Sequence, residues 1–166
     1  DLLELSRLQS GTIAFDKSKF DIAELVYDVV QRYEMIADES GHKLLMQLPE
    51  HIPLVYTNPD RAEQLLIILL DNAFKHASEN GSVLLRIEDQ GEKLHISVAN
   101  EGMIAAEDIP HVFERFYKAD KAHTGNGTGL GLSIANEIIK LMGESISVES
   151  SDGTVRFLFT IATYRA

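Results

Sequence analysis

The sharpest chemical signal in the sequence is a run of glycines at alternate positions, Gly125, Gly127, Gly129 and Gly131. The run leads directly into residues 129–142, whose apolar spacing predicts a helix. Glycine lets a backbone approach phosphate oxygens closely, and the free N–H groups of a helix start carry roughly half a positive charge. Neither a preceding strand nor a following Lys-Ser/Thr pair is present, which excludes a Rossmann fingerprint and a P-loop. The run therefore indicates either a phosphate cradle of another type or a flexible hinge.

A second polar group lies on the helix predicted for residues 58–76. Asn72, Lys75 and His76 are three and four residues apart, so they share one face of that helix. An asparagine oxygen is a suitable hard ligand for Mg²⁺, and a lysine ammonium can neutralise a phosphate. The same spacing is also that of a solvated helix end, so these residues by themselves leave both interpretations open.

Two weaker signals lie between these groups. Asn100-Glu101-Gly102 follows a predicted strand, where a strand exit and a glycine either aim a side chain at a ligand or simply make a turn. Residues 113–118, with Lys121 and His123, form a small cationic and aromatic cluster in an acidic protein. Phe113 and Phe116 in this cluster could either anchor a lid or pack in the core.

Composition limits the classes of function. A length of 166 residues predicts one domain, and 45% hydrophobic residues are enough for a globular core. The absence of cysteine excludes disulfides and thiolate metal sites and fits the cytoplasm. The apolar run 65–70 is far shorter than the ~20 residues of a membrane span, so no membrane contact is expected from this chain. A net charge of −11 argues against a nucleic-acid partner.

The elements that must position these residues follow from periodicity and caps. Asp21 with Glu24, and Asn58 before Pro59, are typical helix starts. Residues 101–128 are mostly polar, with one helical turn expected at 110–113, and so long a loop is usually functional or mobile. The sum predicts an α/β layered domain with about three main helices on one face of a mixed sheet. Helices are expected over 2–9, 22–38, 58–76 and 129–142, and strands over 12–15, 43–48, 54–57, 82–88, 94–99, 145–149 and 154–161.

The order of these pieces closely resembles the N, G1, F, G2 and G3 boxes of sensor histidine kinases. The boxes are Asn72-Ala-Phe-Lys75-His76, Asn100-Glu-Gly102, Phe113-Glu-Arg-Phe116, Gly127-Thr-Gly-Leu-Gly131-Leu132 and Gly153-Thr154. The resemblance covers residues 21–161 and implies the two-layer α/β sandwich (Bergerat-type ATP-binding fold) of the gyrase, Hsp90, histidine kinase and MutL group, with a mobile ATP lid. Residues 1–10 resemble the end of a preceding dimerisation helix, which leaves 11–166 as the catalytic ATP-binding domain.

The resemblance also implies a role for each matching residue, with ATP and Mg²⁺ as the cofactors. Asn72 would hold Mg²⁺, Lys75 would contact a phosphate, and His76 would lie against the adenine or ribose. Asn100 would bind the adenine edge. Gly102 and Ile104 would form the floor of the adenine pocket, and Thr154 would complete the adenine end of the site. The lid and the phosphate cradle are implied at Phe116, Lys118, His123, Asn126, Gly127, Thr128, Gly129, Leu130, Gly131 and Leu132.

Three positions depart from the family pattern. Ile68 stands where the family has a second asparagine, four residues before the metal ligand. Asn100 replaces an aspartate, and Gly102-Met103-Ile104 is one residue shorter than usual and lacks a second glycine. None of the six histidines is followed by an acidic residue, as the family's phosphoacceptor is, so this chain is not expected to phosphorylate itself.

The implied function is that of a protein histidine kinase domain in the cytoplasm. It would position Mg-ATP for transfer of the γ-phosphate to a histidine on an upstream dimerisation domain. Its partners would be that domain, a response regulator and, in a homodimeric parent with or without a membrane anchor, a second copy. The alternative is a degenerate module of the same fold that binds nucleotide or protein without catalysis. An ATP hydrolase of the wider group would need a glutamate base at the position of Ile68. A serine kinase of the anti-sigma type shares the boxes but not the opening helix.

Overall fold

The computed structural model describes residues 2–11, 15–117 and 129–165. The predicted site residues Lys118, His123, Asn126, Gly127 and Thr128 lie outside these ranges, as does all of the predicted lid, 117–128, except Tyr117. The described helices are α1 (Leu2–Ser10), α2 (Ile22–Ser40), α3 (Pro59–His76), the 3-10 turn η1 (Ile109–His111) and α4 (Gly131–Met142). The strands are β1 (Ser18–Phe20), β2 (Lys43–Gln47), β3 (Val55–Thr57), β4 (Ser82–Asp89), β5 (Lys93–Glu101), β6 (Ile146–Ser151) and β7 (Thr154–Ala162).

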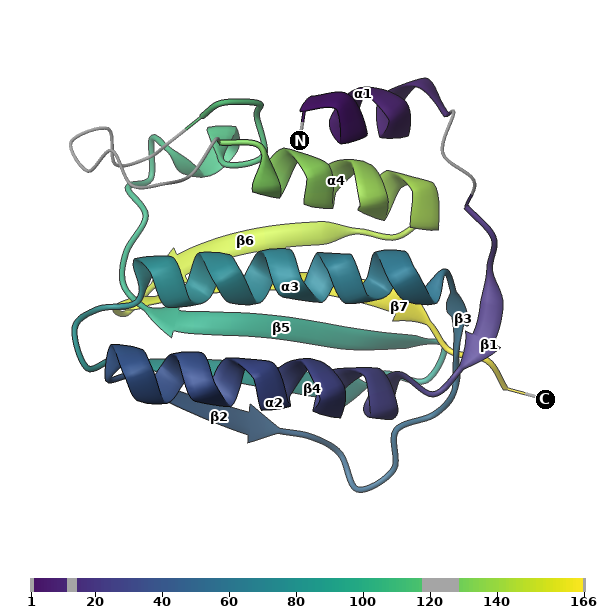
Figure 1. Ribbon diagram of the computed structural model, residues 1–166, viewed down its shortest axis with the longest axis horizontal. Coiled ribbons are helices and arrows are strands. Elements are labelled where there is room, and N and C mark those ends of the chain that lie inside the picture. Colours follow the sequence, from purple (N-terminus) through teal and green to yellow (C-terminus); the bar gives the residue numbers. More distant parts are fainter. Residues whose placement is uncertain (1, 12–14, 118–128, 166) are drawn as a thin grey trace.

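The main layer is a five-stranded mixed sheet in the order β2-β4-β5-β7-β6. β2 runs parallel to β4, and the other neighbours are antiparallel. Parallel strands need a long crossover, which here contains α3. Figure 1 shows α2, α3 and α4 on one side of this sheet, with α1 lying beside α4. The predicted mixed-sheet α/β architecture with three main helices on one face is therefore confirmed.

The two central helices begin at the predicted capping residues. The Asp21 side chain accepts a hydrogen bond from the Ala23 N–H at 2.9 Å. The Asn58 side chain accepts one from the Arg61 N–H at 3.0 Å, and Pro59 occupies the first turn. Each cap satisfies an N–H group that has no partner inside its helix, which fixes where the helix begins.

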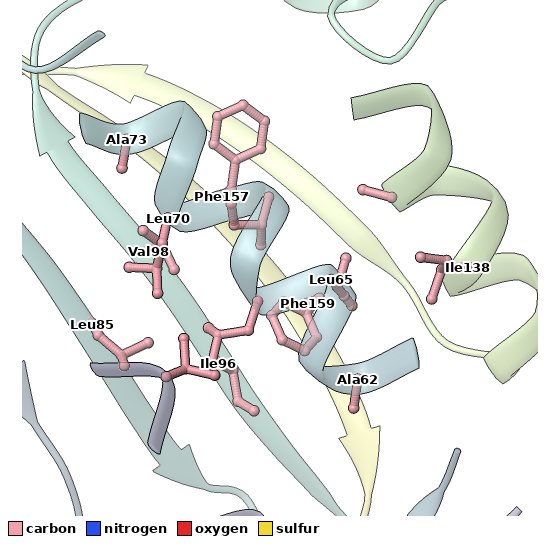
Figure 2. Close-up of a cluster of buried hydrophobic side chains, with 14 of the residues drawn as sticks. Ala62, Leu65, Leu70, Ala73, Leu85, Ile96, Val98, Ile138, Phe157 and Phe159 are labelled. Carbon is pink, nitrogen blue, oxygen red and sulfur yellow. The ribbon is translucent and has the colours of Figure 1, made fainter. Parts of the chain in front are cut away.

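The core lies between the helices and the sheet. The predicted apolar face of α3 is buried throughout and packs over β5 and β7 (Figure 2). The burial of this face holds α3 against the sheet, near the strand ends where the candidate site lies. The buried residues of this core that Figure 2 labels are Ala62, Leu65, Leu70, Ala73, Leu85, Ile96, Val98, Ile138, Phe157 and Phe159.

Several predicted boundaries are wrong, including those of one strand, one helix and one helical turn. Of the strand expected at 12–15, only Phe15 is described and it lies outside any strand; β1 begins at Ser18, because its place is set by pairing with β3. α4 begins at Gly131 rather than Gly129, whose φ of +75° cannot be part of a right-handed helix. The helical turn expected at 110–113 is η1, which begins one residue earlier.

α1 is docked on the domain. Its Leu5 and Leu8 are buried in the same core as the other helices, and α1 packs against α4. Glu4 accepts hydrogen bonds from Gln64 at 2.8 Å and from Arg61 at 3.3 Å, both at the start of α3. The division of the chain at residue 10 into a dimerisation helix and a catalytic domain stays a prediction.

Candidate nucleotide-binding site

The end of α3 and the end of β5 meet at Gly102. A Cβ at this position would lie 3.2 Å from the His76 carbonyl oxygen and 3.0 Å from Asn100 Nδ2. The φ of Gly102 is +158°, which residues with a side chain rarely adopt. The Ser78 N–H also donates to the Glu101 carbonyl at 2.9 Å, across the same junction. Glycine therefore lets the N box and the G1 box lie in direct contact.

The predicted adenine-binding residues converge on the turn between β6 and β7. The Gly102 N–H donates to the Gly153 carbonyl at 2.9 Å, and Thr154 pairs with Glu101 in the sheet. The Ile104 N–H donates to the Ser150 hydroxyl at 3.0 Å. Sequence reasoning missed Ser150, because a serine on a strand carries no signal for the loop that it will hold.

Asn100 is a buried polar side chain at this end of the sheet. Only 3% of it is exposed, and its Nδ2 donates to the Glu101 carbonyl at 3.1 Å. A buried amide is costly without such partners. The side chain is therefore held near the strand exit, next to Gly102, and its role toward the base stays a prediction.

The start of α4 faces α3. A Cβ at Gly131 would lie 3.7 Å from Ile68 Cγ2, so the first turn of α4 lies against Ile68. Asn72 and Lys75 follow Ile68 by four and seven residues, on the same row of α3. Among the described residues, no side chain caps the start of α4 at Leu130. Within the described residues the first N–H groups of α4 have no side-chain capping partner, so they can donate to an anion beside the row that carries Asn72.

The F box and the G2 box are joined through their backbones. The Phe116 N–H donates to the Gly129 carbonyl at 2.8 Å, and a Cβ at Gly129 would lie 2.7 Å from Phe116 Cα. Phe116 is 57% exposed with Arg115 over its ring at 5.5 Å, whereas Phe113 packs edge-on against Phe157 at 6.0 Å. Of the two phenylalanines that the sequence left open, Phe113 packs in the core and Phe116 lies at the surface.

A small polar cluster precedes residue 118. The Tyr117 hydroxyl donates to the Asp108 carboxylate, and this hydrogen bond raises the pKa of Tyr117 to about 12. The Tyr117 ring lies 5.3 Å from the ring of His111, whose Nδ1 is 2.6 Å from Glu114 Oε1. These contacts tie η1 to the chain that leads to the predicted lid.

Comparison with known families identifies the class of protein to which this chain belongs. Residues 57–165 match the family described as histidine kinase-, DNA gyrase B- and HSP90-like ATPase. The chain belongs to this family of ATPase domains. Within the described ranges, no helix combines the length and apolar character needed to cross a membrane.

Relatives and solved structures point to one branch of the family. The sensor histidine kinase WalK of Bacillus subtilis (strain 168) is 35% identical over 158 residues, covering 92% of this chain and 26% of WalK. The adaptive-response sensory kinase SasA of Crocosphaera subtropica (strain ATCC 51142 / BH68) is 29% identical, covering 99% of this chain and 44% of SasA. The chain thus spans between a quarter and a half of these two curated relatives.

Two solved structures support the same assignment. Full-length ShkA in complex with AMPPNP superposes with a TM-score of 0.86 at 28% identity, covering 99% of this chain and 35% of ShkA. The nucleotide-free catalytic domain of the histidine kinase ThkA gives a TM-score of 0.79 at 29% identity, covering 91% of this chain and 97% of that domain. The matched region is the ATP-binding catalytic domain of sensor histidine kinases, as the order of the boxes predicted.

Proposed function

We propose that this domain binds Mg-ATP and positions its γ-phosphate for transfer to a histidine on an upstream dimerisation domain. The observation that carries the proposal is the contact of the start of α4 with Ile68, on the row of α3 that holds Asn72 and Lys75. In this proposal the parent protein is a homodimer that passes its phosphoryl group to a response regulator. The domain works in the cytoplasm, whether or not the parent is anchored in a membrane.

The residues of the site suit the two ends of ATP. At the base end, Asn100, Gly102, Ile104 and Thr154 lie around one strand exit. At the phosphate end, the amides of Gly131 and Leu132 and the ammonium of Lys75 would orient the phosphates.

The residues present also fit a magnesium ion. Asn72 is half-buried and offers an amide oxygen, and Mg²⁺ prefers one or two protein oxygens together with phosphate oxygens and water. When bound, the ion would neutralise the charge that develops on the phosphate oxygens during transfer. Asn72 would hold it on the side of α3 that faces the start of α4.

The alternative, a degenerate module without catalysis, is favoured by Ile68. This side chain packs against the core at the position of the family's second asparagine, so one polar contact to the metal shell is missing. ATP binding and phosphotransfer therefore have to be measured separately.

Phosphotransfer between separate domains is the direct test. The domain is mixed with the dimerisation domain of its parent protein, and with radiolabelled Mg-ATP. We expect acid-labile label on the dimerisation domain and none on this chain alone. Mg-ATP binding by calorimetry without any transfer would support the non-catalytic module. Absence of binding at millimolar nucleotide would contradict the kinase function and any nucleotide-binding module, and would leave only a protein-interaction module.

Base selectivity gives a further prediction, which concerns Asn100→Asp. A carboxylate only accepts hydrogen bonds, so it suits the adenine 6-amino group and repels the guanine 6-oxo group. A hydrogen bond to a charged group contributes about 1.5–3 kcal/mol and a neutral one about 0.5–1.5 kcal/mol. The substitution also gives up the donation from Nδ2 to the Glu101 carbonyl. We expect the preference for ATP over GTP to rise roughly tenfold, at about 1.4 kcal/mol per decade.

The measurement is the pair of dissociation constants for ATP and GTP on both proteins, at one salt and one magnesium concentration. The ratio cancels any general loss of binding that the substitution causes. An unchanged ratio would show that Asn100 does not read the base.

A further inference from the structure

One buried tyrosine of α2 contacts three residues of α3. The Tyr33 hydroxyl donates to the Asp71 carboxylate and lies 3.3 Å from the Ile67 carbonyl oxygen. The Tyr33 ring stacks on Phe74, with centroids 5.8 Å apart and planes 15° apart. Ile67, Asp71 and Phe74 are spaced by four and three residues, so they form one row along α3. Tyr33 therefore attaches the last turns of α3 to α2 along a single line.

The next row of α3 carries the candidate phosphate-end residues. Ile68, Asn72 and Lys75 each follow a residue of the Tyr33 row by one position, which is a rotation of about 100° in a helix of 3.6 residues per turn. Ile68 is the residue that meets Gly131 at the start of α4. Any rotation of α3 about its axis would thus move Asn72 relative to the amides of α4.

The hydrogen bond made by the Tyr33 hydroxyl constrains the relative orientation of α2 and α3 more tightly than ring stacking alone does. Tyr33 is only 5% exposed, and burial together with the Asp71 hydrogen bond raises the pKa of Tyr33 well above its usual value. The hydroxyl is protonated at neutral pH, as that of any tyrosine is, and so it donates to Asp71. Stacking on Phe74 tolerates sliding and small rotations, whereas the hydrogen bond to Asp71 is directional and so adds a constraint on the rotation of α3 at this row.

We propose that Tyr33, acting through Asp71, is a positioning residue that sets the orientation of Asn72 for Mg-ATP. The inference rests on the proposed function, in which Asn72 holds the metal. Mg²⁺ requires nearly ideal octahedral geometry, so a small displacement of one ligand lowers its affinity. Residues that orient metal ligands from behind typically contribute about 10–100-fold in metal affinity.

The test uses the full chain and the substitution Tyr33→Phe, which keeps the ring stack and removes the hydroxyl. Dissociation constants for ATP are measured by calorimetry with excess Mg²⁺ and with EDTA. We expect about tenfold weaker binding in Mg²⁺ and a change of less than about twofold in EDTA. Tyr27→Phe is the matched control, since it makes the same change at a half-exposed site on the same helix. It is expected to bind like the parent under both conditions.

Two substitutions of Asp71 test whether Tyr33 acts through it. Asp71→Asn keeps an acceptor oxygen and is expected to retain most of the Mg²⁺-dependent affinity, whereas Asp71→Leu loses it. The double variant Tyr33→Phe/Asp71→Leu should bind no more weakly than Asp71→Leu, because both changes remove one interaction. Additive losses would overturn the proposal. So would equal weakening in Mg²⁺ and in EDTA, which is the result of a merely structural role, or unchanged binding by Tyr33→Phe.

A reference variant separates this inference from the proposed function. If Asn72→Ala removes the Mg²⁺-dependent affinity and Tyr33→Phe does not, the positioning role fails and the metal assignment stands. If Asn72→Ala leaves that affinity intact, the metal assignment fails and the positioning role fails with it.

Discussion

Replacing Asn72 with alanine is expected to remove the Mg²⁺-dependent part of ATP binding. Ile68, one turn earlier on the same row of α3, has no oxygen to substitute for the lost ligand. Residues that merely support a metal ligand contribute about 10–100-fold, so loss of the ligand itself should weaken Mg-ATP binding by about 100-fold or more. The fold should persist, because Asn72 is at the edge of the core rather than in it.

Calorimetric titration of ATP in Mg²⁺ and in EDTA measures this loss directly. The affinity in EDTA is the internal control, since the base recognition proposed for Asn100 does not depend on the metal. Ile68→Asn supplies the converse variant, because an added amide oxygen on the same row should strengthen binding in Mg²⁺. Undiminished Mg-ATP binding by Asn72→Ala would show that the central helix has been assigned wrongly.

A second large loss is expected from Gly129→Ala. The added Cβ would lie 2.7 Å from Phe116 Cα and 2.8 Å from its carbonyl carbon, and backbone atoms cannot yield as a flexible side chain can. The φ of +75° at Gly129 adds strain of about 1–3 kcal/mol. Separation of the two backbones would also displace the start of α4, so Mg-ATP affinity and stability should fall together.

Gly143→Ala is a close control for this substitution. Gly143 has nearly the same φ, +71°, yet nothing in the described part of the chain lies within 4 Å of its added Cβ. Urea unfolding should therefore show a smaller loss of stability for Gly143→Ala, and its ATP dissociation constant should not change. Equal losses of ATP affinity in the two variants would contradict the role of the Gly129–Phe116 contact.

Most of the fold could be predicted because its elements carry local signals. Asp21 and Asn58 cap α2 and α3 as expected, since a cap depends on residues only two or three positions away. The apolar row of α3 faces the core as its spacing required. These signals operate within a single helix, which is why they can be recognised without knowledge of the partner surface.

The errors arise where structure depends on distant pairing or on the sign of φ. β1 is placed by the match of Phe20 with Val55, and nothing within residues 12–20 specifies that register. Gly129 and Gly131 belong to one glycine run, yet only Gly131 lies in the helix. Glycine allows either sign of φ, so the sequence could not decide between them.

The candidate site likewise has parts that could be predicted from the sequence and parts that could not. Asn100, Gly102 and Thr154 were predicted as one group from the order of the boxes, and the structure brings them to one strand exit. Their roles toward ATP remain predictions. The contact of Tyr33 with Asp71 could not be predicted, because it joins two helices across 38 positions and no periodicity links such a pair.

The docking of α1 bears on how the chain can be shortened. Leu5 and Leu8 cover apolar surface that belongs to the nucleotide-binding fold, mainly on α4. A variant that begins at residue 15 would leave this surface open to solvent, and contiguous exposed apolar patches promote self-association. All the residues predicted to bind ATP would be retained. Removal of the first helix is therefore expected to cause aggregation of the protein rather than weaker binding of nucleotide.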